Sequence, residues 1–193
     1  MRAVRIIIFL LVVTGLIWLV VVLFQNVFTN GNDTSNSDTE LSLVSYADTD
    51  AVATMYIEGP VVANQDHNAV RIAIDRNQSS VEVIKGYDGQ VVAQQVFPNT
   101  QASYLEFLSA LDKSGYTKGN SDPDLRDDKG SCPFGNRYIY TLNNGAKEVL
   151  RYWITNCSGG GGTYGGKTSL TRELFLRQIP EKDLDSITKD IAL

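Results

Sequence analysis

The chain has 193 residues, with 17 basic and 22 acidic side chains, one histidine, two cysteines and a net charge of −5. The acidic balance argues against nucleic acid as a partner, because phosphate binding needs a basic surface. One histidine and two cysteines are too few for a multi-histidine metal site or a four-cysteine zinc site. We therefore predict neither a metal nor a cofactor, in a chain long enough for one domain and an anchor.

Apolar residues gather near the N-terminus. In Ile6–Phe24 every residue is large and apolar except one threonine and one glycine. As a helix this run would be about 28 Å long, close to the roughly 30 Å of hydrocarbon in a bilayer. Two arginines precede it, and the positive-inside rule then places the N-terminus in the cytoplasm. A cleaved signal peptide has a shorter apolar region that ends at small residues. We therefore predict a cytoplasmic segment at residues 1–5 and an uncleaved transmembrane helix at residues 6–25.

Polar residues follow the apolar run, and Thr29–Glu40 contains no large apolar side chain. Such a segment cannot bury enough surface to offset its ordering entropy, so residues 26–48 are predicted to be a flexible tether. Residues 49–193 then form an exported domain of ordinary size. Residues 1–24 hold two arginines and no acid, so the remainder has 15 basic and 22 acidic side chains and a net charge of −7. These features predict a single-pass cell-membrane protein whose acidic C-terminal domain is extracytoplasmic.

Sequence periodicity predicts an α+β fold for this domain. Apolar and polar residues alternate as in strands at residues 51–57, 70–75, 81–84, 90–97, 137–142 and 148–155. Helical spacing predicts a helix over Gln101–Ser114, a second helix around Leu174 and a short third helix that starts at Pro180. Hairpins dominate this order, so the sheet is expected to be mainly antiparallel, with two to three helices.

The two cysteines lie on either side of a predicted hairpin. If Asn144 and Gly145 form its two-residue turn, opposed residue numbers add up to 289, as those of Cys132 and Cys157 do. This register makes the cysteines a non-hydrogen-bonded pair, whose close side chains suit a disulfide, although Pro133–Gly135 would interrupt the ladder before it. A redox-active pair is the alternative, but such pairs usually lie close together in sequence. We predict a structural disulfide that closes the hairpin.

Residues 161–168 match the phosphate-binding pattern G-x-x-x-x-G-K-[ST] in full. Three features disfavour nucleotide binding: nucleoside triphosphates are scarce outside the cell, the preceding strand belongs to a hairpin, and only about 25 residues follow. We interpret the segment as a flexible glycine-rich loop, with Thr168 or Ser169 as the cap of the next helix. A binding loop is a third interpretation.

His67 and an acidic loop are the remaining candidates for chemistry. His67 is the only histidine, lies in a polar stretch and has no nucleophile motif beside it, so we predict a surface histidine. The aspartates of residues 122–128 lack the ordered spacing of a calcium loop, which favours a solvated loop. A pair of carboxylates for glycoside hydrolysis is a spatial property that no spacing in this chain supports.

The predicted hairpin is rich in large side chains. In the register that pairs the cysteines, Tyr138 faces Arg151, and Tyr140 and Trp153 lie on the same side. One interpretation is that one side of the hairpin is core and a helix covers the other. The functional interpretation is an exposed surface of residue types that are enriched at interface hot spots. The candidate binding surface comprises Tyr138, Tyr140, Arg151, Trp153 and, from the glycine-rich segment, Tyr164.

Several short segments follow one another in a recognisable order: Gly86–Gly89, Cys132-Pro133, Arg137–Tyr140, Trp153, Cys157, Gly165-Gly166 and Leu174–Pro180. This order resembles a group of uncharacterised single-pass exported proteins of candidate-phylum bacteria of the Saccharibacteria type. The resemblance implies a bacterial cell-surface setting. It transfers no activity, substrate or catalytic residue.

Two classes of function remain open at this stage. The first is a non-enzymatic binding module, anchored by its N-terminal helix, whose partner is a protein or an envelope polymer. The second is a hydrolase that acts on envelope polymers, which needs converging carboxylates or a serine near His67.

Overall fold

The computed structural model describes residues 42–159 and 161–188. The predicted membrane helix and most of the predicted tether lie outside these residues. Within them, no helix has the length and apolar character needed to span a bilayer. The folded domain begins earlier than residue 49, because Leu43 and Ala47 are buried in its core.

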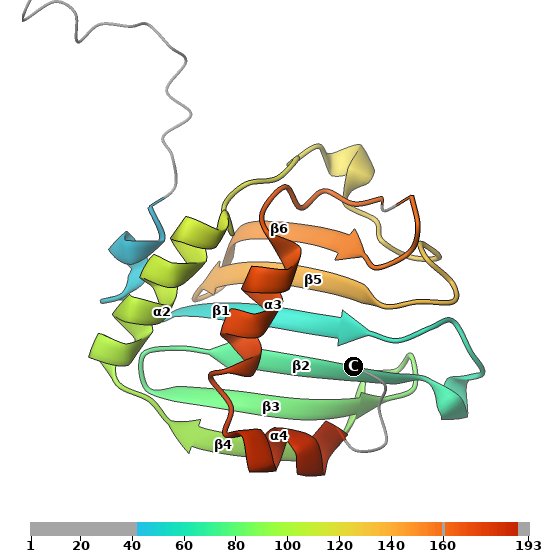
Figure 1. Ribbon diagram of the computed structural model, residues 1–193, viewed down its shortest axis with the longest axis horizontal. Coiled ribbons are helices and arrows are strands. Elements are labelled where there is room, and N and C mark those ends of the chain that lie inside the picture. The colour runs from blue at the N-terminus through green and yellow to red at the C-terminus, as the bar shows by residue number, and fades with distance from the viewer. Residues whose placement is uncertain (1–41, 160, 189–193) are drawn as a thin grey trace, which may run out of the picture. The chain divides into compact units, whose positions relative to one another are not determined.

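One antiparallel sheet of six strands forms the scaffold, in the order β4-β3-β2-β1-β5-β6 (Figure 1). All five neighbouring pairs are antiparallel. The predicted α+β fold with an antiparallel sheet is therefore confirmed. The strands are β1 (Ala51–Glu58), β2 (Asn68–Ile74), β3 (Gln78–Lys85), β4 (Gln90–Pro98), β5 (Arg137–Asn144) and β6 (Lys147–Thr155).

Three helices lie on one face of the sheet (Figure 1): α2 (Gln101–Ser114), α3 (Thr168–Leu176) and α4 (Glu181–Thr188). Short 3₁₀ turns occur at η1 (Leu43–Tyr46), η2 (Asn64–Asp66) and η3 (Pro123–Leu125). The Thr100 hydroxyl accepts the Ser103 N–H and caps α2, and Gly115 ends this helix with φ of 83°. The expected hydroxyl cap of α3 is wrong, because Lys167 is its N-cap residue and makes no side-chain cap bond.

The core lies between the sheet and helices α2 and α3. Alternate residues of β1 and β2, such as Met55 and Ile72, are fully buried on the helix-bearing face. Aromatic rings fill the space above β5, where Phe175 meets Phe107 edge-to-face at 5.2 Å between centroids. Tyr140 lies 5.8 Å from Tyr116 in a similar geometry.

The register of the β5–β6 hairpin differs from the prediction. Asn144 pairs with Lys147 across the turn, and a bulge between Leu142 and Asn143 adds one residue to β6. Beyond this bulge, opposed residue numbers add up to 292, as for Tyr138 and Ile154, and not to 289. The observed register thus differs from the predicted one by three residues. Because successive side chains of a strand point to opposite faces, an odd shift changes which β6 residues share a face with Tyr138.

The predicted disulfide between Cys132 and Cys157 is confirmed, with 5.7 Å between their Cα atoms. It does not continue the ladder, which ends at Arg137 and Thr155. A turn in which the Gly135 N–H donates to the Cys132 carbonyl absorbs the additional residues. The disulfide therefore closes the hairpin through a compact loop beyond the sheet.

Candidate functional site

The aromatic side chains that were predicted to form a binding surface are buried. Tyr138, Tyr140, Trp153 and Tyr164 all belong to the buried residues of the domain, and Tyr140 is 0% exposed. Tyr138 and Tyr140 are part of the hydrophobic core beneath the helices. The expected exposed aromatic surface on this hairpin is therefore wrong. Of the alternative, a core side and a side covered by a helix, the core side is confirmed.

Trp153 and Arg151 lie on the opposite face of the sheet from Tyr140, because cross-strand partners share a face and Trp153 pairs with Ile139. A loop covers them there, not a helix. The Trp153 indole N–H donates to the Leu125 carbonyl at 2.8 Å, and an Arg151 N–H donates to the Arg126 carbonyl at 2.7 Å. The hairpin thus places its four predicted surface residues on two opposite faces of the sheet.

The glycine-rich segment packs along the outer edge of β6. The Thr163 N–H donates to the Trp153 carbonyl at 2.8 Å, and Gly162 forms an isolated bridge with Ile154. A Cβ atom on Gly162 would lie 2.8 Å from the Ile154 Cα and closer still to the Trp153 carbonyl oxygen. Glycine is therefore required by close packing. Residues 162–164 form an ordered strap, and not the flexible loop that was predicted.

The backbone of this segment leaves little for a phosphate to bind. The N–H groups of Gly165 and Lys167 donate to the carbonyls of Lys118 and Ser114, both at 2.9 Å. The Tyr164 hydroxyl bonds with the Thr171 hydroxyl at 2.6 Å, which ties the segment to α3. A phosphate-binding loop needs its N–H groups directed at the ligand, so this geometry supports the structural interpretation of residues 161–168.

His67 is a buried residue, so the predicted surface histidine is wrong. Its ring stacks on Tyr87 with 4.0 Å between centroids, and its Nε2 lies 3.5 Å from a Glu58 carboxylate oxygen. The Pro60 carbonyl lies 3.4 Å from Nδ1. These contacts hold the loop between β1 and β2 against the sheet.

Buried charges form a chain of ion pairs next to His67. Arg137, whose side chain is 3% exposed, pairs with Glu58 at 2.8 Å and lies 3.5 Å from Asp128. Asp128 also pairs with Arg151 at 2.6 Å, so this part of the predicted solvated loop is buried. Residues 42–159 and 161–188 contain no group of three or more His, Cys, Asp or Glu side chains that could hold a metal ion.

Exposed apolar side chains gather instead beside the disulfide. Phe134 is 93% exposed, and Val61 and Val62 are 47% and 43% exposed. The Val61 N–H donates to the Pro133 carbonyl at 2.8 Å, which places the two loops side by side. The Tyr87 hydroxyl bonds to both the N–H and the carbonyl of Val62 at 3.0 Å. We call Val61, Val62 and Phe134 the apolar tip.

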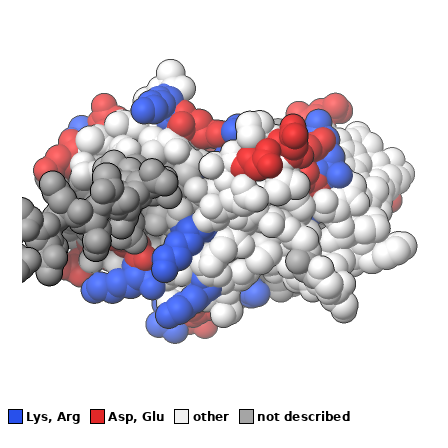
Figure 2. All heavy atoms as spheres, turned by 90° about the horizontal axis from the view of Figure 1, so that it is seen from above, with Lys and Arg blue, Asp and Glu red and all other residues white. Residues whose placement is uncertain are grey.

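The segments that contain the apolar tip carry no charge, whereas the adjoining Asp66 and Asp88 are charged and exposed. Residues 59–65, 130–136 and 156–159 include no Asp, Glu, Lys or Arg, although the chain has 39 such residues in total, 17 basic and 22 acidic. In Figure 2 this end of the domain lies at the right, as in Figure 1, and shows mostly uncharged side chains. Charged side chains are frequent over the rest of the face that is drawn. An uncharged apolar surface is the composition of an interface centre.

Sequence reasoning missed the apolar tip. The available signal was the uncharged Gly130–Asn136 segment, which places an apolar Pro133-Phe134 pair next to a cysteine. No protein-family model matches the chain, and no curated protein is significantly similar to it. Function therefore has to be inferred from the chain's own residues.

Proposed function

We propose that the chain is a single-pass, membrane-anchored protein whose exported domain is a binding module without catalytic activity, and that its apolar tip enters an apolar pocket of a protein partner at the cell surface. The observation that carries the proposal is Phe134, 93% exposed on a loop closed by a disulfide. The membrane part rests on the sequence, with residues 6–25 as the anchor and the preceding arginines orienting it.

Phe134 suits an interface because it is apolar and held in place. The Cys132–Cys157 disulfide and the bond from Val61 to Pro133 fix the loop that presents it. A preordered loop loses little backbone entropy on binding, so more of the burial free energy of Phe134 becomes affinity. Aromatic residues are enriched and charged residues depleted at interface centres, as they are here.

The apolar tip lies far from the point at which the chain enters the sheet. The chain enters the sheet at Ala51, and β1 ends at Glu58, next to the tip. At about 3.3 Å per residue, the two ends of β1 are roughly 23 Å apart. The apolar tip and the point at which the chain enters the sheet therefore lie at opposite ends of β1.

Site-specific cross-linking in the native envelope tests the proposal. The full-length protein with a photo-reactive phenylalanine analogue in place of Phe134 should cross-link to a protein. The same analogue in place of Val96, which is 51% exposed on β4, is the matched control and should not capture that protein. Phe134→Ser should then weaken binding of the purified partner roughly 10- to 150-fold, because burial of a phenylalanine contributes about 1.5–3 kcal/mol.

Two results would overturn the proposal. Cross-links from position 134 that reach lipid or polysaccharide and no protein would show that the apolar tip has another kind of partner. An unchanged affinity of the Phe134→Ser variant would show that this side chain is not an anchor. The Val96→Ser variant should bind as the unmodified protein does, which separates a specific effect from a general loss of surface apolarity.

A further inference from the structure

The outer edge of β6 carries backbone groups that the sheet does not use. The Trp153 N–H donates to the Thr163 hydroxyl at 3.0 Å, and its carbonyl accepts the Thr163 N–H, so both groups point away from β5. Backbone groups alternate along a strand with a period of two residues. Arg151 and Trp153 pair with Thr141 and Ile139 in unbroken register, so the N–H and carbonyl of Arg151 also point outward.

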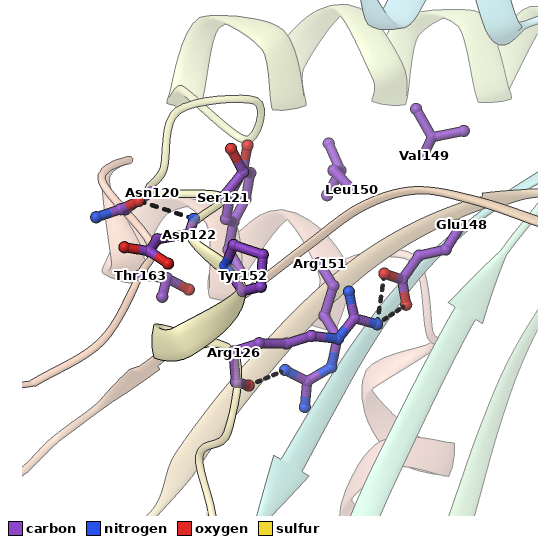
Figure 3. A pocket seen from close by; sticks show the side chains of 11 residues that line it. Asn120, Ser121, Asp122, Arg126, Glu148, Val149, Leu150, Arg151, Tyr152 and Thr163 are labelled. Atoms are coloured by element: carbon purple, nitrogen blue, oxygen red, sulfur yellow. Dashed lines mark hydrogen bonds and ion pairs between the residues drawn. The ribbon is translucent and has the colours of Figure 1, made fainter.

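A pocket of about 260 Å³ lies against this edge (Figure 3). Residues 148–152 form one wall, residues 120–123 form the opposite wall, and Thr163 lines it as well. The strap that pairs with Trp153 therefore ends where the pocket begins. The pocket occupies the position that another strand would take beside Arg151, and an open strand edge is a template for strand addition.

Two acidic and two basic side chains line the pocket, and one of the acids has no cationic partner among the described residues. Arg126 pairs with Glu148 at 2.7 Å (Figure 3). Arg151 pairs with Asp128, which lies outside the lining, so both cations already have an anionic partner. A further carboxylate in the lining, Asp122, forms no ion pair with any residue that the structure describes, and one of its oxygens accepts the Asp124 N–H. The pocket therefore favours a positively charged ligand.

We propose that this pocket binds an extended basic peptide segment, which adds to the edge of β6 as a short strand and places a lysine or arginine side chain against Asp122. The N–H and carbonyl of Arg151 supply the main-chain hydrogen bonds, and Asp122 selects the charge. This site is separate from the apolar tip and does not depend on a partner binding there.

Titration of the full-length protein with a fluorescent peptide of alternating threonine and lysine tests the proposal. The peptide should bind, its counterpart with glutamate in place of lysine should not, and binding should slow hydrogen exchange of the Arg151 amide. Asp122→Asn keeps an oxygen for the Asp124 N–H, so the loop is preserved, yet binding should weaken about two- to fivefold. Asp124→Asn removes a neighbouring charge outside the pocket lining and should leave affinity unchanged.

N-methylated peptides separate strand addition from simple charge attraction. Only alternate N–H groups of an added strand face its neighbour, so methylation of one alternate set should abolish binding and methylation of the other should not. Equal effects of the two sets would overturn the proposal. Equal binding of the glutamate peptide would overturn it too, as would an Asp122→Asn variant with unchanged affinity.

Discussion

Removal of the disulfide should cost the domain about 3.5 kcal/mol in free energy of unfolding. The bond joins residues separated by 25 positions, Cys132 and Cys157. In the chain-entropy model, release of a loop of that length adds about 12 cal/mol/K to the entropy of the unfolded chain, or about 3.5 kcal/mol at 25 °C. For a domain of this size, each kcal/mol shifts the melting temperature by roughly 2–4 °C, so a decrease of about 7–14 °C is expected.

Urea unfolding of the Cys132→Ser/Cys157→Ser variant, followed by circular dichroism, measures this loss. The native loop keeps other contacts, such as the bond from Val61 to Pro133 and that from Arg137 to the Ser131 carbonyl at 3.1 Å. The variant should therefore fold, and the unmodified protein under reducing conditions should match its stability. A loss below about 1 kcal/mol, or equal unfolding of the oxidised and reduced protein, would refute the reasoning.

Two further predictions concern packing and pH. Gly162→Ala should destabilise the domain by about 1–3 kcal/mol, because its Cβ would lie 2.8 Å from the Ile154 Cα, whereas a Cβ on Gly161 meets no atom within 4 Å. Urea unfolding compares Gly162→Ala with Gly161→Ala, and equal midpoints would contradict a packed strap. Burial raises the pKa of Tyr116 and Tyr140 above the usual 10.0, so the folded state disfavours the phenolate. These two groups should therefore leave the free energy of unfolding unchanged below pH 10 and lower it above pH 10. A pH titration followed by tyrosinate absorbance and circular dichroism measures this. Ionisation of all tyrosines before the domain unfolds would contradict the prediction.

Local patterns predicted the strands and α2 well, because alternation and capping are properties of neighbouring residues. Helix α2 spans Gln101–Ser114 and ends at Gly115, as expected from its apolar spacing and the terminal glycine. The predicted hairpin register was wrong by three positions. Two of them arise because the turn lies at Gly145-Ala146 and not at Asn144-Gly145, and the third is a bulge in β6 at Val149, which local sequence does not specify. The cysteine pair was predicted correctly from an incorrect register, since the loop at Ser131–Gly135 supplies the residues that the ladder does not.

Burial of polar side chains was the least predictable property. His67 lies in a sequence stretch that is polar throughout, yet its ring contacts Glu58 and Pro60 at the end of β1 and Tyr87 after β3, which are two separate parts of the chain. Each contact depends on the order of the strands in the sheet, and the residues around His67 do not predict that order. The same limit applies to Asp128, whose burial needs arginines from both β5 and β6.

The apolar tip follows from one long-range pairing. Glu58 pairs with Arg137 at the last position of the β1–β5 ladder, so the loop that leaves β1 and the loop that enters β5 must emerge at the same end of the sheet. Separately, Val61 and Phe134 are single exposed apolar residues, which are ordinary on protein surfaces. Side by side in uncharged segments, and with their loops joined by a main-chain bond and one of them closed by a disulfide, they form a surface with the composition of an interface. The proposed binding surface thus depends on the strand order, which the hairpin sequence alone does not contain.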